Sequence, residues 1–303
     1  MLNYLPYSQR TPNENYKNVL RDILANGLRT PTPQVNAQGE PIEALTLMGA
    51  TPMRFRLENG FPMLTERDIS GFWKTPIAEM LAFINGARTQ EKLEEFGCKW
   101  WKFWATAEKC AKRGLETGDL GPGSYGAAFH DFPTAEGESF NQFAAILEQI
   151  KQRPELRTHF ITPWIPQYTV RLDGRQQKVV VCPCHGWIHL RVIENKLILH
   201  MFQRSGDFPV GVPSNMIQYA ALLLMLAQAL DLEPYEYVHT VSDAHIYLDQ
   251  RETVEEILAR PTHPFPTVTL TNPTKDIFTV RKDDFELSDY VAEPAIKKIP
   301  VGI

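Results

Sequence analysis

The stretch that decides the fold is 183-PCHGWIHLRVIENKLILHMFQRSGDFPVGVPSNMIQYAALLLMLAQALDLEPYEYVHTVSDAHIY-247. Apolar and polar residues alternate over residues 187–192 and 197–202, which is typical of half-buried β-strands, and Glu194-Asn195 between them suits a hairpin turn. Pro213 then begins a segment that stays apolar almost all round to about Leu230, as expected of a helix buried inside a large domain. We therefore expect a sheet core packed around one long helix.

The segments on either side of this stretch add further helices and strands. Prolines, Gly39 and Asn36 predict an exposed loop at residues 30–41, and no repeat or linker divides the chain. The sequence therefore predicts one α+β domain over residues 1–303. Apolar spacing predicts helices at residues 14–27, 77–84, 140–150 and 252–259, and strands at 45–48, 53–57, 179–182, 267–270 and 277–280.

Composition narrows the class of protein. The formal net charge of the 303 residues is -5, so a small phosphorylated ligand held by a few placed arginines is favoured over a nucleic acid. The few, unevenly placed cysteines favour free thiols in the reducing cytoplasm. The N-terminus lacks a secretion-signal pattern, and the apolar run 219–227 is far below the roughly 20 residues that cross a bilayer. We expect a cytoplasmic protein without a membrane span.

Cys184 is the candidate nucleophile. It lies at the end of a β-pattern, where a side chain can point into a cavity, and Arg204 on the next strand of the predicted hairpin can lower the pKa of the thiol. By position alone, a lone cysteine in a strand is more often a small buried hydrophobe. The run 182–185 also suggests metal ligands, but a zinc site needs a second ligand pair at regular spacing, which the other two cysteines do not provide. We expect no metal site.

Three further polar residues suit a nucleotide. Arg204 and Ser205 offer a bidentate cation and a hydroxyl, a combination that binds a phosphate monoester, although by composition alone Arg204 is a surface arginine. Asn215 falls early in an otherwise apolar helix, where an amide is costly without a partner. Its donor and acceptor match the O4 and N3–H edge of a uracil-type base, and helix capping is the alternative interpretation.

In this order, these residues resemble the thymidylate synthase family, which includes the deoxynucleotide hydroxymethylases. The resemblance extends from about Asn26 to the last residue. It implies an α+β fold in which a large mixed β-sheet is packed with helices around a long buried central helix. The matching segments outside the central stretch are Asn59-Gly-Phe-Pro62, Glu79, Trp101, Trp104, Gly118-Asp-Leu-Gly-Pro122, Tyr125 and Pro294-Ala-Ile-Lys-Lys-Ile-Pro-Val-Gly-Ile303.

The resemblance also implies a covalent mechanism. Cys184 as a thiolate adds to C6 of a pyrimidine deoxynucleoside monophosphate, so that C5 can attack the methylene carbon of the cosubstrate 5,10-methylenetetrahydrofolate. Glu79 runs the water network that moves protons, Tyr125 helps to remove the C5 proton, and Asp207 binds the pterin ring.

The resemblance assigns the remaining site residues to the nucleotide and to the folate. The phosphate site borrows an arginine across a two-fold axis, which implies a homodimer. A C-terminal tail at residues 290–303 closes over the ligands and excludes water. For the phosphate, the resemblance implies Arg204, Ser205, Arg157 from the partner subunit and, as a weaker candidate, Arg29. It implies Asn215 for the base, and His245 and Tyr247 for the sugar. The residues implied for the folate are Asp207, Trp101, Trp104, Ser214 and Ile303. For Trp101 and Trp104, an ordinary aromatic core is the alternative.

Departures from the family pattern gather around the cofactor and the phosphate, not at the reacting carbon. Ser214 stands where a phenylalanine normally lines the folate site. The other departures are Gly206 for a cysteine, Thr158 for the second borrowed arginine, Arg67 for a lysine that meets the folate tail, Lys102 and Phe103 for two acids, and Arg29-Thr-Pro-Thr-Pro33 for the phosphate loop.

Ser214 bears on which product is formed. A synthase reduces the shared exocyclic methylene intermediate by hydride from tetrahydrofolate, whereas a hydroxymethylase lets water add to it. Because serine opens volume and supplies a hydroxyl, we expect a deoxyuridylate hydroxymethylase, and Trp101 favours the alternative, thymidylate synthesis. Asn215 stands where cytidylate-specific relatives have an aspartate, which favours deoxyuridylate over deoxycytidylate as the substrate. Deoxycytidylate hydroxymethylation is a further alternative.

A non-catalytic paralogue that binds a nucleotide or RNA is the remote alternative. A binding module has no need of a nucleophile, and Cys184, Glu79, Tyr125 and Asp207 are all present. The sequence therefore favours an enzyme.

Overall fold

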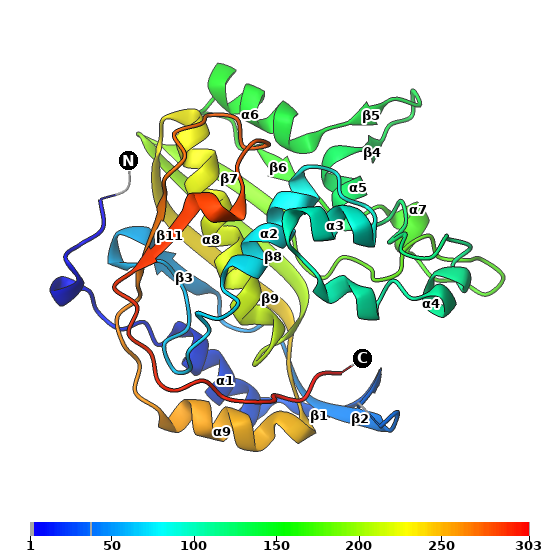
Figure 1. The fold of residues 1–303 in the computed structure, drawn as a ribbon, viewed down its shortest axis with the longest axis horizontal. Coiled ribbons are helices and arrows are strands. Elements are labelled where there is room, and N and C mark those ends of the chain that lie inside the picture. The colour runs from blue at the N-terminus through cyan, green and yellow to red at the C-terminus, as the bar shows by residue number, and fades with distance from the viewer. Residues whose placement is uncertain (1–2, 37, 303) are drawn as a thin grey trace.

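The computed structural model describes residues 3–36 and 38–302, and its main element is a mixed seven-stranded sheet (Figure 1). The strand order is β1-β2-β9-β8-β7-β6, and β3 also pairs with β9. Only β8 and β9 run parallel, while the other pairs are antiparallel. The sheet strands are β1 Leu28–Val35, β2 Pro41–Met48, β3 Met53–Arg56, β6 Phe160–Ile161, β7 Trp187–Ile193, β8 Lys196–Asp207 and β9 Glu233–Tyr247.

Helices cover the sheet, and two small hairpins lie outside it. The hairpins pair β4 with β5 and β10 with β11. The helices are α1 Asn15–Asn26, α2 Lys74–Ile84, α3 Gln90–Phe96, α4 Ala107–Ala111, α5 Tyr125–His130, α6 Gln142–Gln152, α7 Pro166–Thr169, α8 Gly211–Leu230 and α9 Arg251–Ala259, and the remaining strands are β4 Phe132–Pro133, β5 Ser139–Phe140, β10 Thr267–Leu270 and β11 Phe285–Ser288. The expected α+β class, with a mixed sheet around a buried helix, is confirmed.

Helix α8 is the centre of the core. Most of its 20 residues are buried, because it packs between β8 and β9 on one side and α2 on the other. It begins two residues before Pro213, and the proline is tolerated there because the first N–H groups of a helix have no partner within it. Figure 1 shows α8 in yellow near the middle of the molecule, with its axis along the sheet.

The predicted loop at residues 30–41 is wrong for most of its length. Residues 30–35 continue strand β1, which pairs with β2. The prolines at 31 and 33 misled the prediction, but β1 is an edge strand, where a proline without an N–H breaks no ladder on the open side. The sequence patterns at 179–182 and 277–280 also fail to form strands, and the partner of β10 is β11.

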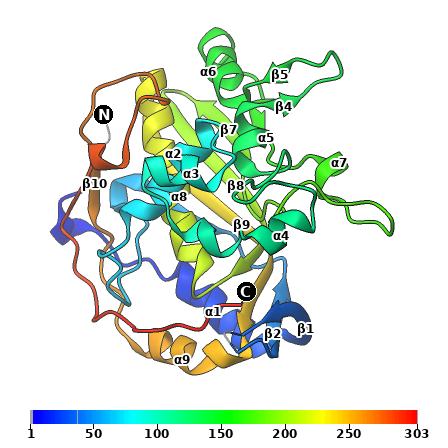
Figure 2. The same cartoon turned by 45° about the vertical axis from the view of Figure 1, so that its right-hand side comes forward.

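The C-terminal tail crosses the molecule without regular structure. Glu293 exchanges backbone hydrogen bonds with Thr65 and Asp68, and Gln250 Nε2 donates to the Pro300 carbonyl at 2.8 Å. In Figures 1 and 2 the tail, drawn in red, runs past α9 towards the β1–β2 hairpin. Its last described residues therefore lie beside the end of β9. Within residues 3–36 and 38–302, no helix is long and apolar enough to cross a membrane.

Candidate active site

Cys184 lies in the loop that leads into β7, and Arg204 of β8 holds that loop. The Arg204 guanidinium donates to the Pro183 carbonyl at 2.7 Å and to the Cys182 carbonyl at 3.0 Å. One of its nitrogens also lies 3.3 Å from Cys184 Sγ. The sequence expectation that Arg204 lies beside Cys184 is therefore met by a direct contact.

Two opposing effects act on the Cys184 thiol. Burial raises its pKa above the usual value, and the positive charge of Arg204 lowers it. Burial is the larger of the two effects, so the protonated thiol is favoured over the thiolate. Added positive charge near Sγ would favour the thiolate. Asp243 also raises this pKa through its negative charge.

Tyr125 lies directly behind the nucleophile. The Cys184 backbone N–H donates to the Tyr125 hydroxyl at 2.6 Å. The ring stacks between Phe83 and His185, with centroid distances of 4.6 Å to each. Burial holds the Tyr125 pKa well above its usual range, so the hydroxyl remains protonated and can donate a hydrogen bond into the site.

Glu79 is a buried carboxylate on helix α2 that accepts three N–H hydrogen bonds. The indoles of Trp100 and Trp101 both donate to Oε1, and Gln218 Nε2 donates to Oε2. Burial raises the pKa of Glu79, while these donors act in the opposite direction. A carboxyl group with a raised pKa suits the transfer of protons.

Asn215 lies in the same buried region, one turn of α8 before Gln218. Its Nδ2 donates to Gln218 Oε1 at 2.8 Å, and its Oδ1 accepts from Gln203 Nε2 of β8 at 3.0 Å. The side chain therefore bonds to other side chains, and the helix-capping alternative does not hold: Asn215 is the fifth residue of α8 and caps nothing.

The parallel register of β8 and β9 brings four further residues together. Ser205 pairs with Asp243 and Asp207 pairs with His245 along the ladder. Ser205 Oγ donates to Asp243 Oδ2 at 2.9 Å, and the rings of His245 and Tyr247 lie 5.2 Å apart. Ser205, Asp207 and His245, which the resemblance assigned to the site, occupy one end of the sheet together with Asp243, which it did not.

Two buried polar atoms at this end of the sheet lie near each other. His245 Nδ1 and Asp243 Oδ1 lie 3.4 Å apart, within ion-pair distance, but their geometry does not make a hydrogen bond and both are buried. Buried polar groups are normally paired. The imidazole and the carboxylate oxygen therefore act as electrostatic partners of each other at this end of the sheet.

Asp207 connects the site to the tail. Gln250 Nε2 donates to both Asp207 carboxylate oxygens at 3.2 Å and to the Pro300 carbonyl at 2.8 Å. Burial raises the pKa of Asp207 to about 6, and the charge of His245 opposes this. An added Cβ on Gly302 would lie 2.7 Å from the Tyr247 ring, which shows how closely the tail approaches β9.

Five predicted residues lie apart from this cluster or outside the structure. Arg29 is exposed on β1 and forms an ion pair with Glu43, and Arg157 is exposed before the edge strand β6. The Trp104 ring faces Lys109 at 4.4 Å instead of Glu79. The Ser214 side chain makes no hydrogen bond within the described residues, and Ile303 lies outside them.

Sequence reasoning missed several residues that the structure brings to the site. Trp100, adjacent to Trp101, reaches Glu79, and Gln218 links Glu79 to Asn215. Gln250, on the turn before α9, reaches Asp207. The available signal was a glutamine in the most apolar helix of the chain, since a buried amide needs a partner.

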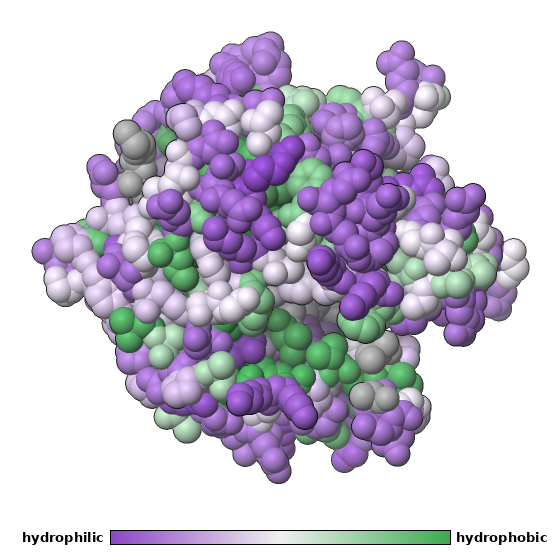
Figure 3. All heavy atoms as spheres, in the orientation of Figure 1, coloured by the Kyte–Doolittle hydropathy of each residue, from purple (hydrophilic) through white to green (hydrophobic). Residues whose placement is uncertain are grey.

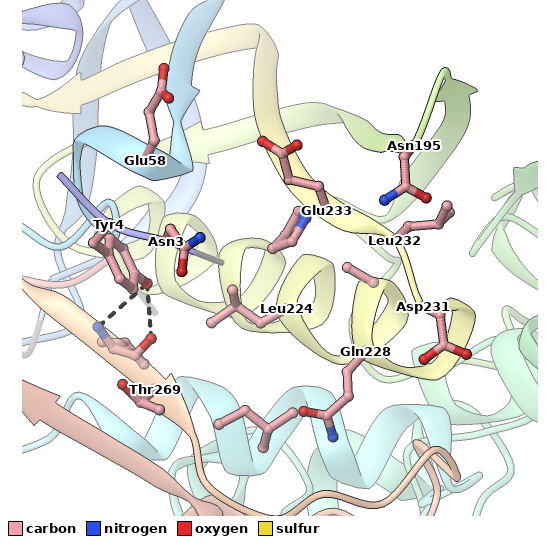
Figure 4. Close-up of a pocket in the computed structure, with 14 residues that line it drawn as sticks. Asn3, Tyr4, Glu58, Asn195, Leu224, Gln228, Asp231, Leu232, Glu233 and Thr269 are labelled. Carbon is pink, nitrogen blue, oxygen red and sulfur yellow. Dashed lines mark hydrogen bonds between the residues drawn. The ribbon is translucent and has the colours of Figure 1, made fainter. Parts of the chain in front are cut away.

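A hollow is visible on one face of the molecule, and a cavity lies away from the cluster. Figure 3 shows a hollow near the middle of this face, with hydrophobic residues along its lower side. A cavity of about 610 Å³ lies at the opposite end of α8, next to Leu224, Gln228 and Asp231 (Figure 4). Among the residues described, no group of three or more His, Cys, Asp or Glu could hold a metal ion.

A comparison with protein-family models identifies the chain's relatives. The model described as thymidylate synthase matches residues 14–301, nearly the whole length. The chain therefore belongs to the thymidylate synthase family, whose members transfer a one-carbon unit to a pyrimidine nucleotide with methylenetetrahydrofolate as cosubstrate.

Proposed function

We propose that this member of the thymidylate synthase family transfers a one-carbon unit from 5,10-methylenetetrahydrofolate to C5 of deoxyuridylate, with Cys184 as the nucleophile. The observation that carries the proposal is the contact between Cys184 Sγ and Arg204 at 3.3 Å, in a site where Glu79 and Tyr125 are both buried. Addition of the thiolate to C6 forms one S–C bond and makes C5 nucleophilic.

Arg204 and Ser205 are the proposed phosphate ligands. Arg204 bonds to two loop carbonyls, so a phosphate has to compete with these neutral acceptors for the guanidinium. A dianion is the stronger partner, because charge-assisted bidentate bonds are roughly twice as strong as neutral ones. Arg157 of a second copy completes this site in our proposal, and Arg29 is a weaker candidate because Glu43 already neutralises it.

The sugar and the base have their own proposed ligands. His245 and Tyr247 lie near each other at the end of β9, where His245 Nδ1 lacks a hydrogen-bond partner, which suits a sugar hydroxyl. Asn215 reads the base edge with the donor and acceptor that Gln218 and Gln203 leave free.

The residues present fit a folate cosubstrate. The Asp207 carboxylate has acceptor capacity beyond its bonds to Gln250, which suits the N–H groups of a pterin, and Trp101 offers an aromatic wall. The cosubstrate supplies the one-carbon unit. Glu79 and Tyr125 hold and move protons beside the base, and the tail excludes water when it closes.

For the last step we propose reduction of the methylene carbon to a methyl group, which makes thymidylate and dihydrofolate, in place of the hydroxymethylation that Ser214 led us to expect. The Gln250–Pro300 hydrogen bond and the approach of Gly302 to Tyr247 support this, because a covered site keeps water from the intermediate. Trp101, fixed by its bond to Glu79, supports it as well. Hydroxymethylation is the second candidate, because the Ser214 hydroxyl has no bond within the described chain and can hold a water.

We also propose a homodimer that forms through the open face of the sheet. Phe160 on β6 and Phe202 on β8 are 51% and 38% exposed, and Trp187 packs edge-on against Phe202. Exposed aromatic side chains grouped on one sheet face favour a protein partner. Arg157 is on the same edge of the molecule, just before β6, from where it can reach a second copy.

Two measurements test the proposal. The chain is incubated with 5-fluorodeoxyuridylate and methylenetetrahydrofolate, and peptide mass spectrometry is expected to find the adduct on Cys184; absence of an adduct contradicts the enzymatic proposal. With deoxyuridylate, a methylated product with dihydrofolate absorbance supports reduction. A product heavier by one oxygen without dihydrofolate supports hydroxymethylation instead.

A further inference from the structure

A row of five buried polar side chains joins helix α2 to strand β9. We call Glu79, Gln218, Asn215, Gln203 and His239 the amide row. Gln218 Nε2 donates to Glu79 Oε2 at 2.5 Å, Asn215 Nδ2 to Gln218 Oε1 at 2.8 Å, and Gln203 Nε2 to Asn215 Oδ1 at 3.0 Å. The row ends where Gln203 Oε1 meets His239 Nε2 at 2.8 Å. Gln218 and His239 are both 0% exposed.

The Glu79 carboxylate fixes the direction of every amide in the row. Oε1 of Glu79 accepts from the two indoles and Oε2 accepts from Gln218, so Gln218 turns its NH₂ group towards the carboxyl group. The oxygen of Gln218 then faces Asn215, which must present its own NH₂ group, and Gln203 follows in the same sense. At the far end His239 carries its proton on Nε2, so the whole row runs one way.

Turning over a single amide in this row is costly. It places two oxygens, or two NH₂ groups, against each other in a region closed to water. Each buried group left without a partner costs about 1–3 kcal/mol. The amide of Asn215 therefore has one stable orientation within the row.

We propose that Gln218 is a positioning residue for base specificity: by bridging Glu79 and Asn215, it locks the orientation in which Asn215 presents one N–H and one oxygen lone pair to the nucleotide. This inference rests on the proposed function. The uracil edge, with O4 and N3–H, and the cytosine edge, with a 4-amino group and N3, present donor and acceptor in opposite order. One asparagine can match both edges only by turning over, and Gln218 prevents this.

The test replaces Gln218 with an unbranched apolar side chain of similar length. Gln218→Met removes both hydrogen bonds of the bridge, and Gln228→Met on the same helix is the matched control, because Gln228 bonds only to the Asn272 and Thr274 carbonyls. The dissociation constants and kcat/KM are measured for deoxyuridylate and deoxycytidylate with each protein. We expect Gln218→Met to lower the preference for deoxyuridylate about tenfold, the effect of one lost hydrogen bond.

The ratio between the two nucleotides separates positioning from a structural role. If Gln218 has a merely structural role, its replacement weakens the binding of both nucleotides by the same factor. An unchanged ratio of the two dissociation constants therefore overturns the inference. The control is expected to keep the ratio of the wild type. If the wild type forms no adduct with 5-fluorodeoxyuridylate, the proposed function has failed, and the inference fails with it; if the adduct forms but the ratio does not move, only the inference fails.

A second variant covers the case in which Gln218→Met does not fold. Glu79→Gln keeps the size of the side chain but replaces the acceptor that sets the direction of the row. Binding of the two nucleotides is measured without chemistry, by calorimetry. A smaller preference for deoxyuridylate supports the inference, and a preference equal to that of the wild type overturns it.

Discussion

The two ends of helix α8 differ in how their polar groups are partnered. At the N-terminal end, Asn215 and Gln218 bond to side chains from other elements, and Asp243 and His245 nearby keep buried atoms without a hydrogen bond. At the C-terminal end lies a cavity of about 610 Å³, and none of the residues that line it carries such an atom.

The polar groups of the cavity bond to their immediate surroundings. Tyr4 donates to the Val268 carbonyl, as Figure 4 shows, and Asp231 and Glu58 form surface ion pairs. An ion pair on the surface contributes little to stability. In our proposal the chemistry lies among buried, interlinked polar groups and not at the cavity, and four substitutions test this difference between the two ends.

The largest effect is expected at the nucleophile. Cys184→Ala removes the only group that can add to C6 in our proposal, so kcat is expected to fall by a factor on the order of 10⁴ or more. The product assay with deoxyuridylate measures this, and Cys182→Ser, which keeps the backbone carbonyl that Arg204 binds, is the control with activity within about tenfold of the wild type. An active Cys184→Ala protein is incompatible with covalent catalysis.

The next effect is expected at the buried carboxylate. Glu79→Gln keeps the contacts with the indoles of Trp100 and Trp101 only in part and removes a group able to exchange protons. We expect kcat to fall by roughly 10² to 10⁴, the usual contribution of general acid–base catalysis, with a smaller change in KM. Steady-state kinetics checks this, and a change confined to KM speaks against a role in proton transfer.

The ionised Asp207 side chain is expected to lower the free energy of unfolding, although it is a proposed ligand of the pterin. Its pKa, raised to about 6 from the usual 3.8, means that the folded state binds the proton more tightly. The protonated Asp207 therefore contributes fully to the free energy of unfolding below about pH 4, and this contribution is lost as the pH rises through about 6. Asp207→Asn is expected to raise the free energy of unfolding by about 1–3 kcal/mol at pH 8.

Urea unfolding of the wild type and Asp207→Asn at pH 8 and pH 4 measures this difference. The gain in the free energy of unfolding should shrink towards zero at the lower pH. The variant is also expected to have a lower kcat/KM, because the pterin loses its proposed carboxylate ligand. A gain that is the same at both pH values shows that the Asp207 charge is not its cause.

The smallest effect is expected at the other end of α8. Glu233 lines the cavity and its side chain makes no hydrogen bond within the described residues. Glu233→Gln is expected to change the free energy of unfolding by less than about 0.5 kcal/mol and to leave kcat/KM unchanged. Thermal unfolding and the product assay test this, and a loss of activity shows that the cavity takes part in the function.

Local patterns predicted the central part of the fold well. The β7–β8 hairpin follows from strict alternation around Glu194-Asn195, and α8 from a continuous apolar run. Strand β1 could not be predicted in the same way, because its prolines are acceptable only at an edge, and whether a strand is an edge depends on the whole sheet. The pairing of β10 with β11 also depends on segments distant in sequence.

The site was predictable where its residues follow each other along paired strands. Cys184 and Arg204 flank one hairpin, so their contact follows from the hairpin. Trp100 contacts Glu79 and Trp104 does not, because the short 3₁₀ turn at Trp100–Phe103 directs Trp100 and Trp101 to the same carboxylate. No periodicity in the sequence specifies such a turn.

Tyr235 is one residue more in β9 than the parallel ladder with β8 needs. The ladder passes from the pair Leu197–Pro234 to the pair Ile198–Glu236, and the Tyr235 ring lies 3.7 Å from the Arg56 guanidinium and 5.0 Å from Lys196. Side chains alternate between the two faces of a strand. The extra residue therefore shifts the alternation of β9 relative to β8 by one position, and the shift falls between the first two pairs and all later ones.

This bulge divides β9 into two parts with different tolerance to changes in chain length. We expect loss of Tyr235 to remove the bulge while Ser205 stays opposite Asp243 and Asp207 opposite His245. A deletion farther along, between Tyr237 and Val241, turns His245 to the other face of the sheet. Relatives that differ in length along this strand should therefore differ at the bulge, with the segment that follows it constant in length.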